Sequence, residues 1–231
     1  SLGHPDNVFC SQQARLDRND MLIEVGKIAR AVSVPVSADL EAGFGEDPAA
    51  VGETIRLAIA AGAVAGNIED YRGDKEEPLY ELQESVDRIV AAKRAISDSE
   101  IPFTLVARSD AVLAGFDNGL SVAIERCNRF LAAGADCLFV PGVGDEAGIR
   151  TLVQEIDGPI SVVMGLSGST LKMEHLRDLG VRRVSIGGSL VRAVYLKIQE
   201  AAREMFEQGT FNYAQEQVSQ AELNAIFEKK L

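Results

Sequence analysis

Two carboxylates, Asp39 and Glu41, directly follow the apolar segment 34–38 and precede a turn that contains Gly43 and Gly45. Residues two apart in a strand point to the same side of a sheet, so both carboxylates could face one site. Carboxylates that converge at the end of a buried strand repel each other unless a cation lies between them. Magnesium prefers such hard oxygen ligands, so the spacing predicts a divalent metal site.

Two further apolar runs end in polar residues of the same kind. The sequence Asn67-Ile-Glu69-Asp70 ends one of them, and Ala107-Arg108-Ser109-Asp110 ends the other. In α/β sheets the functional site lies at the carboxyl ends of the strands, so acid, acid and arginine would meet there. Any single carboxylate could equally be a helix N-cap or the ion-pair partner of Arg108. The three strand ends together indicate a functional site.

These side chains predict chemistry that proceeds through an enolate. A divalent ion held by Asp39, with Glu41 and Glu69 reaching it directly or through water, would polarise the oxygens of a 2-oxo acid. Arg108 would bind a carboxylate or phosphonate of the substrate through paired hydrogen bonds. Breaking a bond one carbon away from the carbonyl leaves an enolate, whose charge the metal would stabilise. Retro-aldol cleavage, decarboxylation and phosphorus migration all share this requirement.

The elements that must position these residues form a repeated strand-then-helix pattern. Strict alternation predicts a parallel sheet with helical crossovers, either an open doubly wound sheet or a closed eight-stranded barrel. Six strands do not close such a barrel, but about two βα units before Ser1 would complete it. The six apolar runs, typical of strands buried on both faces, are at 34–38, 64–69, 103–107, 137–140, 160–164 and 181–186.

Helix boundaries are marked by their usual signals. Asp47-Pro48 predicts an N-cap followed by the first helical residue, while Gly62, Gly134 and Gly180 lie where a left-handed residue should end a helix. One helix is expected to bury a face made of Met21, Leu22, Val25, Ile28, Ala29 and Val32.

A further amphipathic segment follows Gly209 and exceeds what a barrel needs. We expect it to cap the barrel or to pack on another subunit. The predicted organisation is therefore a barrel domain at 1–209 and a helical extension at 210–231.

Composition excludes several classes of function. A net charge of -12 argues against a nucleic-acid partner, because phosphate backbones require clustered lysine and arginine. No segment approaches eighteen consecutive apolar residues and no basic, apolar leader opens the chain, so a membrane span is not expected. Three scattered cysteines are too few for a zinc site or a disulfide framework and favour the reducing cytoplasm.

The strand-end motifs resemble the isocitrate lyase/phosphoenolpyruvate mutase superfamily. The motifs Ala38-Asp39-Leu-Glu41-Ala-Gly43-Phe44-Gly45, Asn67-Ile-Glu69-Asp70, Ala107-Arg108-Ser109-Asp110 and Gly134-Ala-Asp136-Cys-Leu-Phe-Val occur in the family's order. The resemblance implies a (β/α)8 barrel of the TIM type whose first two strands precede Ser1. It also implies dependence on Mg²⁺ or Mn²⁺, a small 2-oxo or 2-hydroxy acid substrate, and a homo-oligomer, a dimer or a tetramer, whose subunits exchange a C-terminal helix.

Roles carry over from the resemblance by motif. Asp39 is similar to the main metal ligand of the family, and Glu41 and Glu69 match its outer metal-binding acids. Arg108 matches the arginine that anchors the substrate. Asp6 is similar to another active-site aspartate that follows the family's second strand.

The chain departs from the lyases at two places. Isocitrate and methylisocitrate lyases carry a Lys-Lys/Arg-Cys-Gly-His loop after the strand matching 64–69, and its cysteine serves as acid or base. Here the stretch reads Tyr71-Arg-Gly73-Asp-Lys75-Glu-Glu-Pro78-Leu, which leaves Arg72 and Lys75 as candidates. The lyases also place a glutamate where this chain has Val140-Pro141-Gly142.

The predicted function is therefore a magnesium-dependent lyase that cleaves a C–C or C–P bond of a small 2-oxo or 2-hydroxy acid through an enolate. Two alternatives remain open. One is a phosphonomutase or a phosphonopyruvate-type enzyme, and the other is a non-catalytic relative that binds a dicarboxylate.

Overall fold

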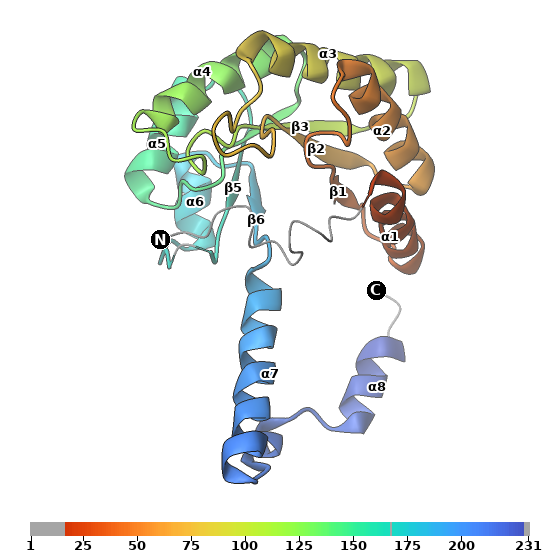
Figure 1. The fold of residues 1–231 in the computed structure, drawn as a ribbon, viewed down its shortest axis with the longest axis vertical. Helices are drawn as coiled ribbons and strands as arrows, with labels where there is room; N and C mark the ends of the chain where they lie inside the picture. The colour runs from red at the N-terminus through yellow and green to blue at the C-terminus, as the bar shows by residue number, and fades with distance from the viewer. Residues whose placement is uncertain (1–16, 167, 229–231) are drawn as a thin grey trace.

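The chain forms a curled, fully parallel sheet of six strands in the order β1 to β6, covered on its outer side by helices (Figure 1). This architecture is seen in a computed structural model that describes residues 17–166 and 168–228. Asp6 lies outside the described residues. The strands are β1 (Ser37–Asp39), β2 (Ala65–Glu69), β3 (Thr104–Arg108), β4 (Cys137–Phe139), β5 (Ile160–Val163) and β6 (Arg183–Ser185).

The helices alternate with the strands, as the sequence pattern predicts. Those that precede β1 or connect consecutive strands are α1 (Arg18–Ala31), α2 (Pro48–Ala61), α3 (Leu82–Ser99), α4 (Gly119–Ala132), α5 (Glu146–Glu155) and α6 (Met173–Leu179). After β6 come α7 (Ser189–Gln208), the 3-10 helix η2 (Asn212–Glu216) and α8 (Gln220–Glu228). The predicted α/β class is confirmed, whereas a complete ring of eight strands is not present in the described residues.

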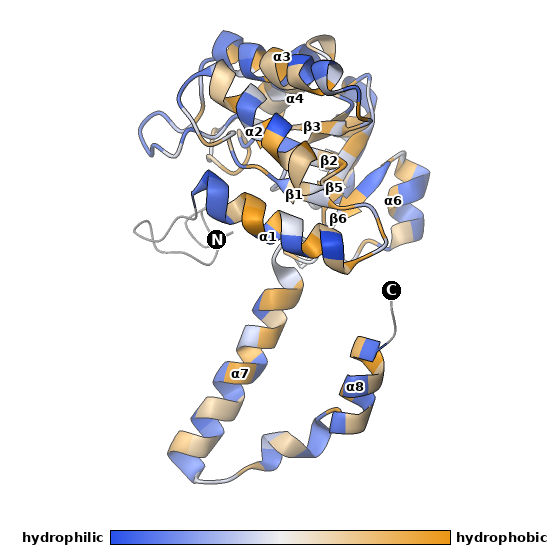
Figure 2. Ribbon diagram, turned by 90° about the vertical axis from the view of Figure 1, so that its right-hand side faces the viewer, coloured by the Kyte–Doolittle hydropathy of each residue, from blue (hydrophilic) through white to orange (hydrophobic). Residues whose placement is uncertain are grey.

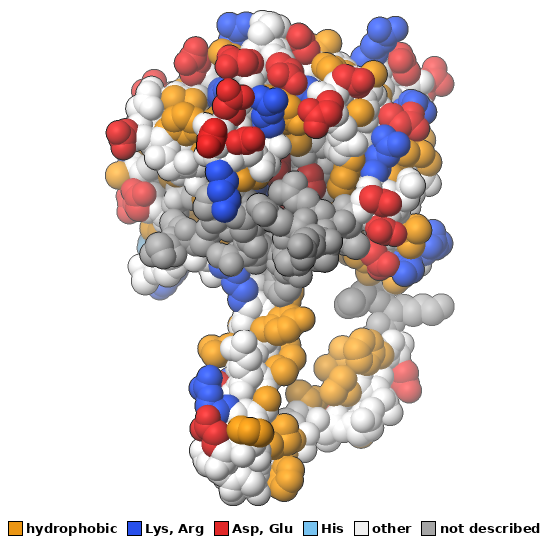
Figure 3. Space-filling model, in the orientation of Figure 1, with side chains coloured by type: hydrophobic (Ala, Val, Ile, Leu, Met, Phe, Trp, Pro, Cys, Tyr) orange, Lys and Arg blue, Asp and Glu red, His pale blue; other side chains and the backbone are white. Residues whose placement is uncertain are grey.

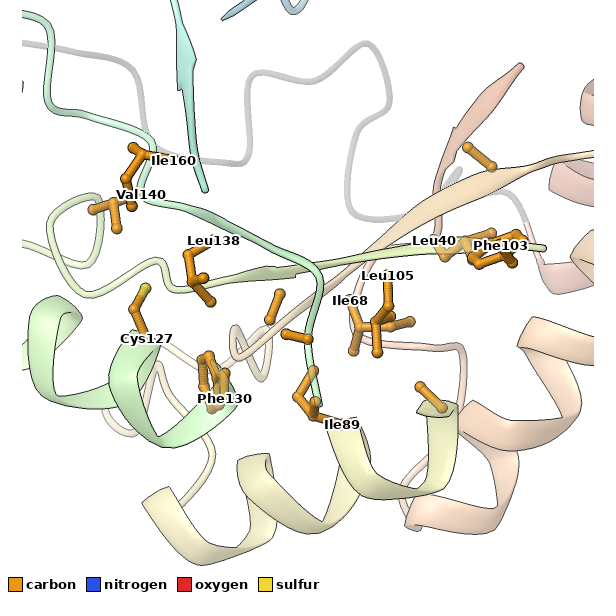
Figure 4. Close-up of a cluster of buried hydrophobic side chains, with 14 of the residues drawn as sticks. Leu40, Ile68, Ile89, Phe103, Leu105, Cys127, Phe130, Leu138, Val140 and Ile160 are labelled. Carbon is orange, nitrogen blue, oxygen red and sulfur yellow. The ribbon is translucent and has the colours of Figure 1, made fainter. Parts of the chain in front are cut away.

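Side-chain alternation gives the sheet two different faces. The outer face carries Leu40, Ile68, Leu105 and Leu138, all buried in the main core against the helices (Figure 4). The opposite, concave face carries a smaller buried cluster of Val106, Cys137, Phe139 and Val163. Polar side chains of the concave face are therefore found next to that small cluster and not in the main core.

The capping predictions are confirmed. The Asp47 carboxylate accepts a hydrogen bond from the Ala50 N–H at 2.8 Å, and Pro48 is the first residue of α2. Gly62, Gly134 and Gly180 have φ values of 99°, 103° and 101°, which lie in the left-handed region that favours glycine. These residues fix where each helix ends and the next strand begins.

Two sequence predictions differ from the structure. The first strand is predicted at 34–38 but is found at Ser37–Asp39, and Val34 is 59% exposed. Pro35 has no N–H to donate, and pairing begins only where Val64 N–H donates to the Val36 carbonyl at 2.9 Å. In α1 the predicted apolar face is only partly buried: Leu22 and Val25 are buried, whereas Ile28 is 53% exposed.

The C-terminal part projects away from the sheet (Figure 1). Helix α7 leaves below β6, and α8 runs back beside it in both ribbon views (Figure 2). None of the described residues of α7, η2 and α8 is buried. Large apolar side chains gather there in the space-filling view (Figure 3). They include Leu190, Val194, Leu196, Ile198, Phe206, Phe211, Ile226 and Phe227.

Gly209, the predicted domain boundary, ends α7 with a φ of 65°. The division into a barrel domain and an extension stays a prediction. Within residues 17–166 and 168–228, no helix combines the length and the apolar character needed to cross a membrane.

Candidate active site

The parallel register brings the predicted residues of three strands to one edge of the sheet. Asp39 of β1 pairs with Asn67 of β2, and Glu69 of β2 pairs with Arg108 of β3. Their neighbours in sequence belong to the core on the helix side, so these four side chains point to the concave face. The predicted meeting of acid, acid and arginine is thus present in the structure.

Asp39 is the exposed member of this group, with 59% of its side chain accessible. Its Oδ1 accepts hydrogen bonds from Asn67 Nδ2 at 2.9 Å and from the Glu41 N–H at 3.2 Å. Its Oδ2 lies 3.9 Å from Arg108 Nη1, which is beyond hydrogen-bond distance. One carboxylate oxygen is therefore fixed in orientation, and the other is placed to take a ligand.

Arg108 is held between two buried carboxylates. Its Nε and Nη2 donate to Asp110 at 2.6 and 2.8 Å, and its Nη1 lies 3.0 Å from Glu69 Oε2. The guanidinium carbon also lies 5.7 Å from the centre of the Phe139 ring. Burial lowers the pKa of Arg108, but Glu69 and Asp110 outweigh it and raise that pKa above its ordinary value. The arginine is therefore permanently charged and fixed in orientation.

Glu69 lies where negative charge is concentrated. Burial raises its pKa well above the ordinary value, Arg108 acts in the opposite direction, and Asp110, Asp39 and Glu41 raise it further. Glu69 is only 6% exposed. Its carboxylate is therefore costly to keep ionised unless a further cation approaches.

A second layer of buried polar residues supports Arg108. Asp70 Oδ1 accepts the Asp110 N–H at 2.8 Å, and Asp70 Oδ2 lies 3.2 Å from Arg126 Nη1. Asp70 is 2% exposed, and burial raises its pKa to about 6, although Arg126 acts to lower it. The geometry links α4 to the site through Asp70 and Asp110. Asp110 is thus an ion-pair partner of Arg108, one of the alternatives that the sequence leaves open for a carboxylate at these strand ends.

The loop after β1, residues 40–47, has an unusual backbone. Glu41, Gly43 and Phe44 have φ values of 50°, 93° and 56°, and two of these residues are not glycine. A left-handed conformation costs a residue with a side chain about 1–2 kcal/mol. The Glu41 carbonyl accepts the Glu69 N–H at 3.0 Å, which ties this loop to β2. Such strain persists only where surrounding contacts impose it, and it is common at functional sites.

The loop at 71–79 stands where the lyases carry their cysteine. Tyr71 and Leu79 form an isolated antiparallel bridge, and Arg72 Nη1 lies 2.9 Å from Glu77 Oε2. The Asp74 carboxylate accepts the N–H groups of Glu76 and Glu77, which lower the pKa of Asp74. The loop is therefore a compact, charged turn that its own contacts hold together.

The other half of the carboxyl edge is different in character. A cavity of about 460 Å³ lies between the loops that follow β4 and β5. It is lined by Gly142, Gly144, Asp145, Glu146, Gly168, Ser169, Thr170 and Leu171. Asp145 caps α5 by accepting the Gly148 N–H at 2.9 Å. This part of the edge, after β4 and β5, thus carries glycines, hydroxyl groups and a helix-capping carboxylate, whereas the edge of β1 to β3 carries the charged cluster.

The donor set fits a hard divalent ion bound mainly through water. Among the described residues, no three histidine, cysteine, aspartate or glutamate side chains lie close enough together to hold a metal directly. Magnesium often binds one or two carboxylates and keeps several waters, and the exposed carboxylate of Asp39 suits this pattern. The negative charge that surrounds Glu69 favours a cation nearby. Asp39, Glu41 and Glu69 therefore remain the candidate metal-binding residues.

The sequence missed several residues that position the site. Asn67 lies in the same motif as Glu69, but the sequence does not show that its amide orients Asp39. Arg126 and Arg88 lie in helices, where periodicity gives no sign that an arginine side chain reaches the loops of the sheet. Both are nevertheless buried, at 9% and 1% exposure. The sequence carries no signal for this burial, because the partners of both arginines are far away along the chain.

Comparisons with known proteins identify the family of this chain. The family model for phosphoenolpyruvate phosphomutase matches residues 1–206. The 2-methylisocitrate lyase of Escherichia coli strain K12 is 30% identical over 218 residues, covering 91% of this chain and 70% of that enzyme.

Solved structures are similar as well. A protein of Burkholderia cenocepacia J2315, proposed to be a lyase or mutase, is 43% identical with a TM-score of 0.89, covering 93% of this chain and 77% of that one. A phosphoenolpyruvate phosphomutase of Streptomyces platensis subsp. rosaceus is 27% identical with a TM-score of 0.77, covering 92% and 76%. The chain belongs to the phosphoenolpyruvate phosphomutase family, within the isocitrate lyase/phosphoenolpyruvate mutase superfamily.

Proposed function

We propose that the protein is a lyase that cleaves a C–C bond of a small 2-oxo or 2-hydroxy acid through an enolate, with Mg²⁺ or Mn²⁺ as cofactor. The observation that carries this proposal is the fixed position of Arg108. Its guanidinium lies 3.0 Å from Glu69 and 2.6 Å from Asp110, beside the exposed carboxylate of Asp39. A permanent cation next to an exposed carboxylate suits an anionic substrate that also contacts a metal.

Each residue has a defined role in this proposal. Asp39 Oδ2 would hold the metal, while Glu41 and Glu69 would accept hydrogen bonds from its waters. When bound, the metal would polarise the substrate carbonyl and stabilise the enolate charge. Arg108 would orient the substrate by binding its carboxylate, and Asp110 keeps the guanidinium in place. Asp6 is proposed as a further active-site residue by motif alone.

A phosphonomutase or a related C–P cleaving enzyme is the second candidate. The match to the phosphomutase family model and the likeness to the Streptomyces platensis mutase favour it. The loop at 71–79 also lacks the cysteine of the isocitrate and methylisocitrate lyases. Both candidates require the same binding of an anion and a metal. They differ in the bond that breaks, C–C or C–P, and in the mutase the phosphoryl group then forms a new P–O bond.

A binding experiment tests the common core of the proposal. Isothermal titration should show that oxalate, an enolate mimic, binds in the presence of Mg²⁺ and not in the presence of EDTA. The Asp39→Ala variant should lose this binding, whereas Asp145→Ala, which removes a carboxylate from the other half of the edge, should keep it. Equal binding by wild type and Asp39→Ala would sink the metal assignment.

A substrate screen separates the two candidates. Release of pyruvate or glyoxylate should be measured with isocitrate, oxaloacetate and related acids, with Mg²⁺ or Mn²⁺. With phosphonopyruvate, phosphorus nuclear magnetic resonance should follow its conversion to phosphoenolpyruvate, or to pyruvate and phosphate. Cleavage of a carbon acid supports the lyase, and turnover of phosphonopyruvate alone supports the second candidate. Oxalate binding without turnover would favour a non-catalytic relative.

The proposal includes a closed eight-stranded barrel in each subunit. It also includes a homo-oligomer, either a dimer or a tetramer. The apolar side chains of α7 and α8 support an assembly in which another copy covers them (Figure 3). Phe206 and Phe227 are 92% and 81% exposed. Light scattering after gel filtration should give a lower mass for Phe206→Asp and Phe227→Asp, and an unchanged mass for Ile23→Asp on α1. The buried free thiols of Cys127 and Cys137 fit the proposed cytoplasmic location.

A further inference from the structure

A buried arginine lies behind the strained loop that follows β1. Arg88, on α3, is 1% exposed. Its guanidinium donates to three backbone carbonyls of the loop, those of Ala42, Gly45 and Glu46, the last two at 2.8 and 3.0 Å. The Tyr80 ring centre lies 4.2 Å from the guanidinium carbon. One side chain thus contacts the loop at three points.

A second buried side chain binds another carbonyl of the same loop. Thr54 of α2 is fully buried, and its hydroxyl donates to the Gly43 carbonyl at 2.7 Å. The space behind the loop is also closely packed, since a Cβ on Gly43 would lie 2.8 Å from Val51 Cγ2. Arg88 and Thr54 together bind the backbone at residues 42, 43, 45 and 46.

Packing alone does not account for an arginine at position 88. No salt bridge to Arg88 is present among the described residues, so its charge is buried against neutral carbonyls and an aromatic face. Desolvating a cation is costly, and an apolar residue would fill the same face of α3 without that cost. Arginine is suited to this position because its planar fork reaches several acceptors at once.

The loop carries one of the candidate metal-binding acids. Glu41 has a φ of 50°, and Phe44 has a φ of 56°. Glu41 directly precedes the carbonyls that Arg88 and Thr54 bind, and Phe44 lies among them. The conformation that presents Glu41 next to Asp39 therefore depends on contacts made from behind the sheet.

A separate set of contacts supports the substrate-binding arginine. Arg126 Nη2 donates to the Tyr80 carbonyl at 2.8 Å, and its Nη1 lies 3.2 Å from Asp70. Asp70 in turn accepts the Asp110 N–H at 2.8 Å. Tyr80 thus lies between two buried arginines that reach different parts of the site.

We propose that Arg88, assisted by Thr54, is a positioning residue for the metal-binding carboxylates. It holds the loop at 41–46 in the conformation that places Glu41 beside Asp39, whereas Arg126 acts on the other side of the site through Asp70 and Asp110. The proposal rests on the proposed function, because it requires that this loop binds a divalent cation.

The test measures Mn²⁺ affinity directly by electron paramagnetic resonance of free Mn²⁺, without substrate. Loss of a group that orients metal ligands typically weakens metal affinity by about 10–100-fold, and we expect this range for Arg88→Met. Thr54→Val, which removes the hydroxyl that binds the Gly43 carbonyl, should weaken Mn²⁺ binding less. Thr54→Ser keeps the hydroxyl and should bind as the wild type does.

Arg126→Lys is the control for a general loss of structure. It should leave Mn²⁺ affinity close to the wild-type value and weaken Mg²⁺-dependent oxalate binding instead. Circular dichroism and thermal unfolding are recorded for every variant. If Arg88→Met does not fold, the Thr54→Val and Thr54→Ser pair decides the question, because both changes are small.

The possible outcomes separate the inference from the proposed function. A wild type that binds no Mn²⁺ overturns the proposed metal site and the inference that depends on it. If the wild type binds Mn²⁺ and either folded Arg88→Met or Thr54→Val binds it with the same affinity, the inference is overturned and the proposed metal site is not. Equal weakening of Mn²⁺ binding by Arg126→Lys also overturns it, because the two sets of contacts would then not be separate.

Discussion

The two halves of the concave face use the same sheet in opposite ways. At the carboxyl ends of β1 to β3 the inward side chains are Asp39, Asn67, Glu69 and Arg108, joined by polar and charged contacts. Under β4 to β6 they include Phe139, Val163 and Ser161, most of them apolar and buried. The strands of the two halves have similar lengths and continuous parallel pairing. The difference therefore lies in the side chains, and it concentrates the reactive chemistry on one half.

Two inward arginines make this comparison quantitative. Arg108 of β3 lies between the buried carboxylates of Glu69 and Asp110. Arg183 of β6 donates to a neutral hydroxyl, that of Ser161, at 3.0 Å. Removing Arg108 leaves two buried carboxylates without a counter-charge, whereas removing Arg183 leaves only a neutral hydroxyl.

The largest effect is expected for Arg108→Met. Loss of the guanidinium leaves Glu69 and Asp110 buried with an uncompensated charge, which typically costs about 3–5 kcal/mol of stability. Urea unfolding followed by circular dichroism measures this loss at neutral pH. A change below about 1 kcal/mol, typical of surface ion pairs, would show that these carboxylates are not held as the structure indicates.

A smaller loss is expected for Asp110→Asn. The amide keeps the size of the side chain but removes the charge from the paired hydrogen bonds at 2.6 and 2.8 Å. Hydrogen bonds to charged groups contribute about 1.5–3 kcal/mol, and Glu69 still compensates Arg108 in this variant. The same unfolding measurement should place Asp110→Asn between Arg108→Met and wild type. A loss as large as that of Arg108→Met would mean that Glu69 contributes nothing.

Arg183→Met in the other half should cost about 1 kcal/mol, because it leaves only the buried Ser161 hydroxyl without its donor. A double-mutant cycle with Ser161→Ala isolates that hydrogen bond. The double variant should be nearly as stable as Ser161→Ala alone. A loss equal to that of Arg108→Met would erase the contrast between the two halves.

The smallest effect concerns a thiol in the apolar half. Cys137 is 6% exposed, and burial raises the pKa of its thiol above the ordinary value. Iodoacetamide at pH 8 should therefore label Cys137 slowly in the native protein and rapidly in urea, as measured by peptide mass spectrometry. Fast native labelling would show that water reaches the concave face under β4.

The sequence was sufficient for the alternation of strands and helices, because period-two and helical patterns depend on local chemistry. It also placed Asp39, Glu69 and Arg108 together, since parallel strands align their carboxyl ends. It did not predict Arg88 or Arg126 as supports, because their partners are backbone carbonyls and residues more than 40 positions away. The exposure of Ile28 was likewise missed, since periodicity identifies an apolar face but not what covers it.

The apolar surface of α7 and α8 has a consequence for the life of a single newly made chain. Phe206, Phe211 and Phe227 are more than 60% exposed. A chain that presents such surface is a ready substrate for chaperones and proteases, which recognise exposed apolar segments. In the proposed homo-oligomer, the cellular abundance of the protein should therefore depend on how quickly another copy covers these helices.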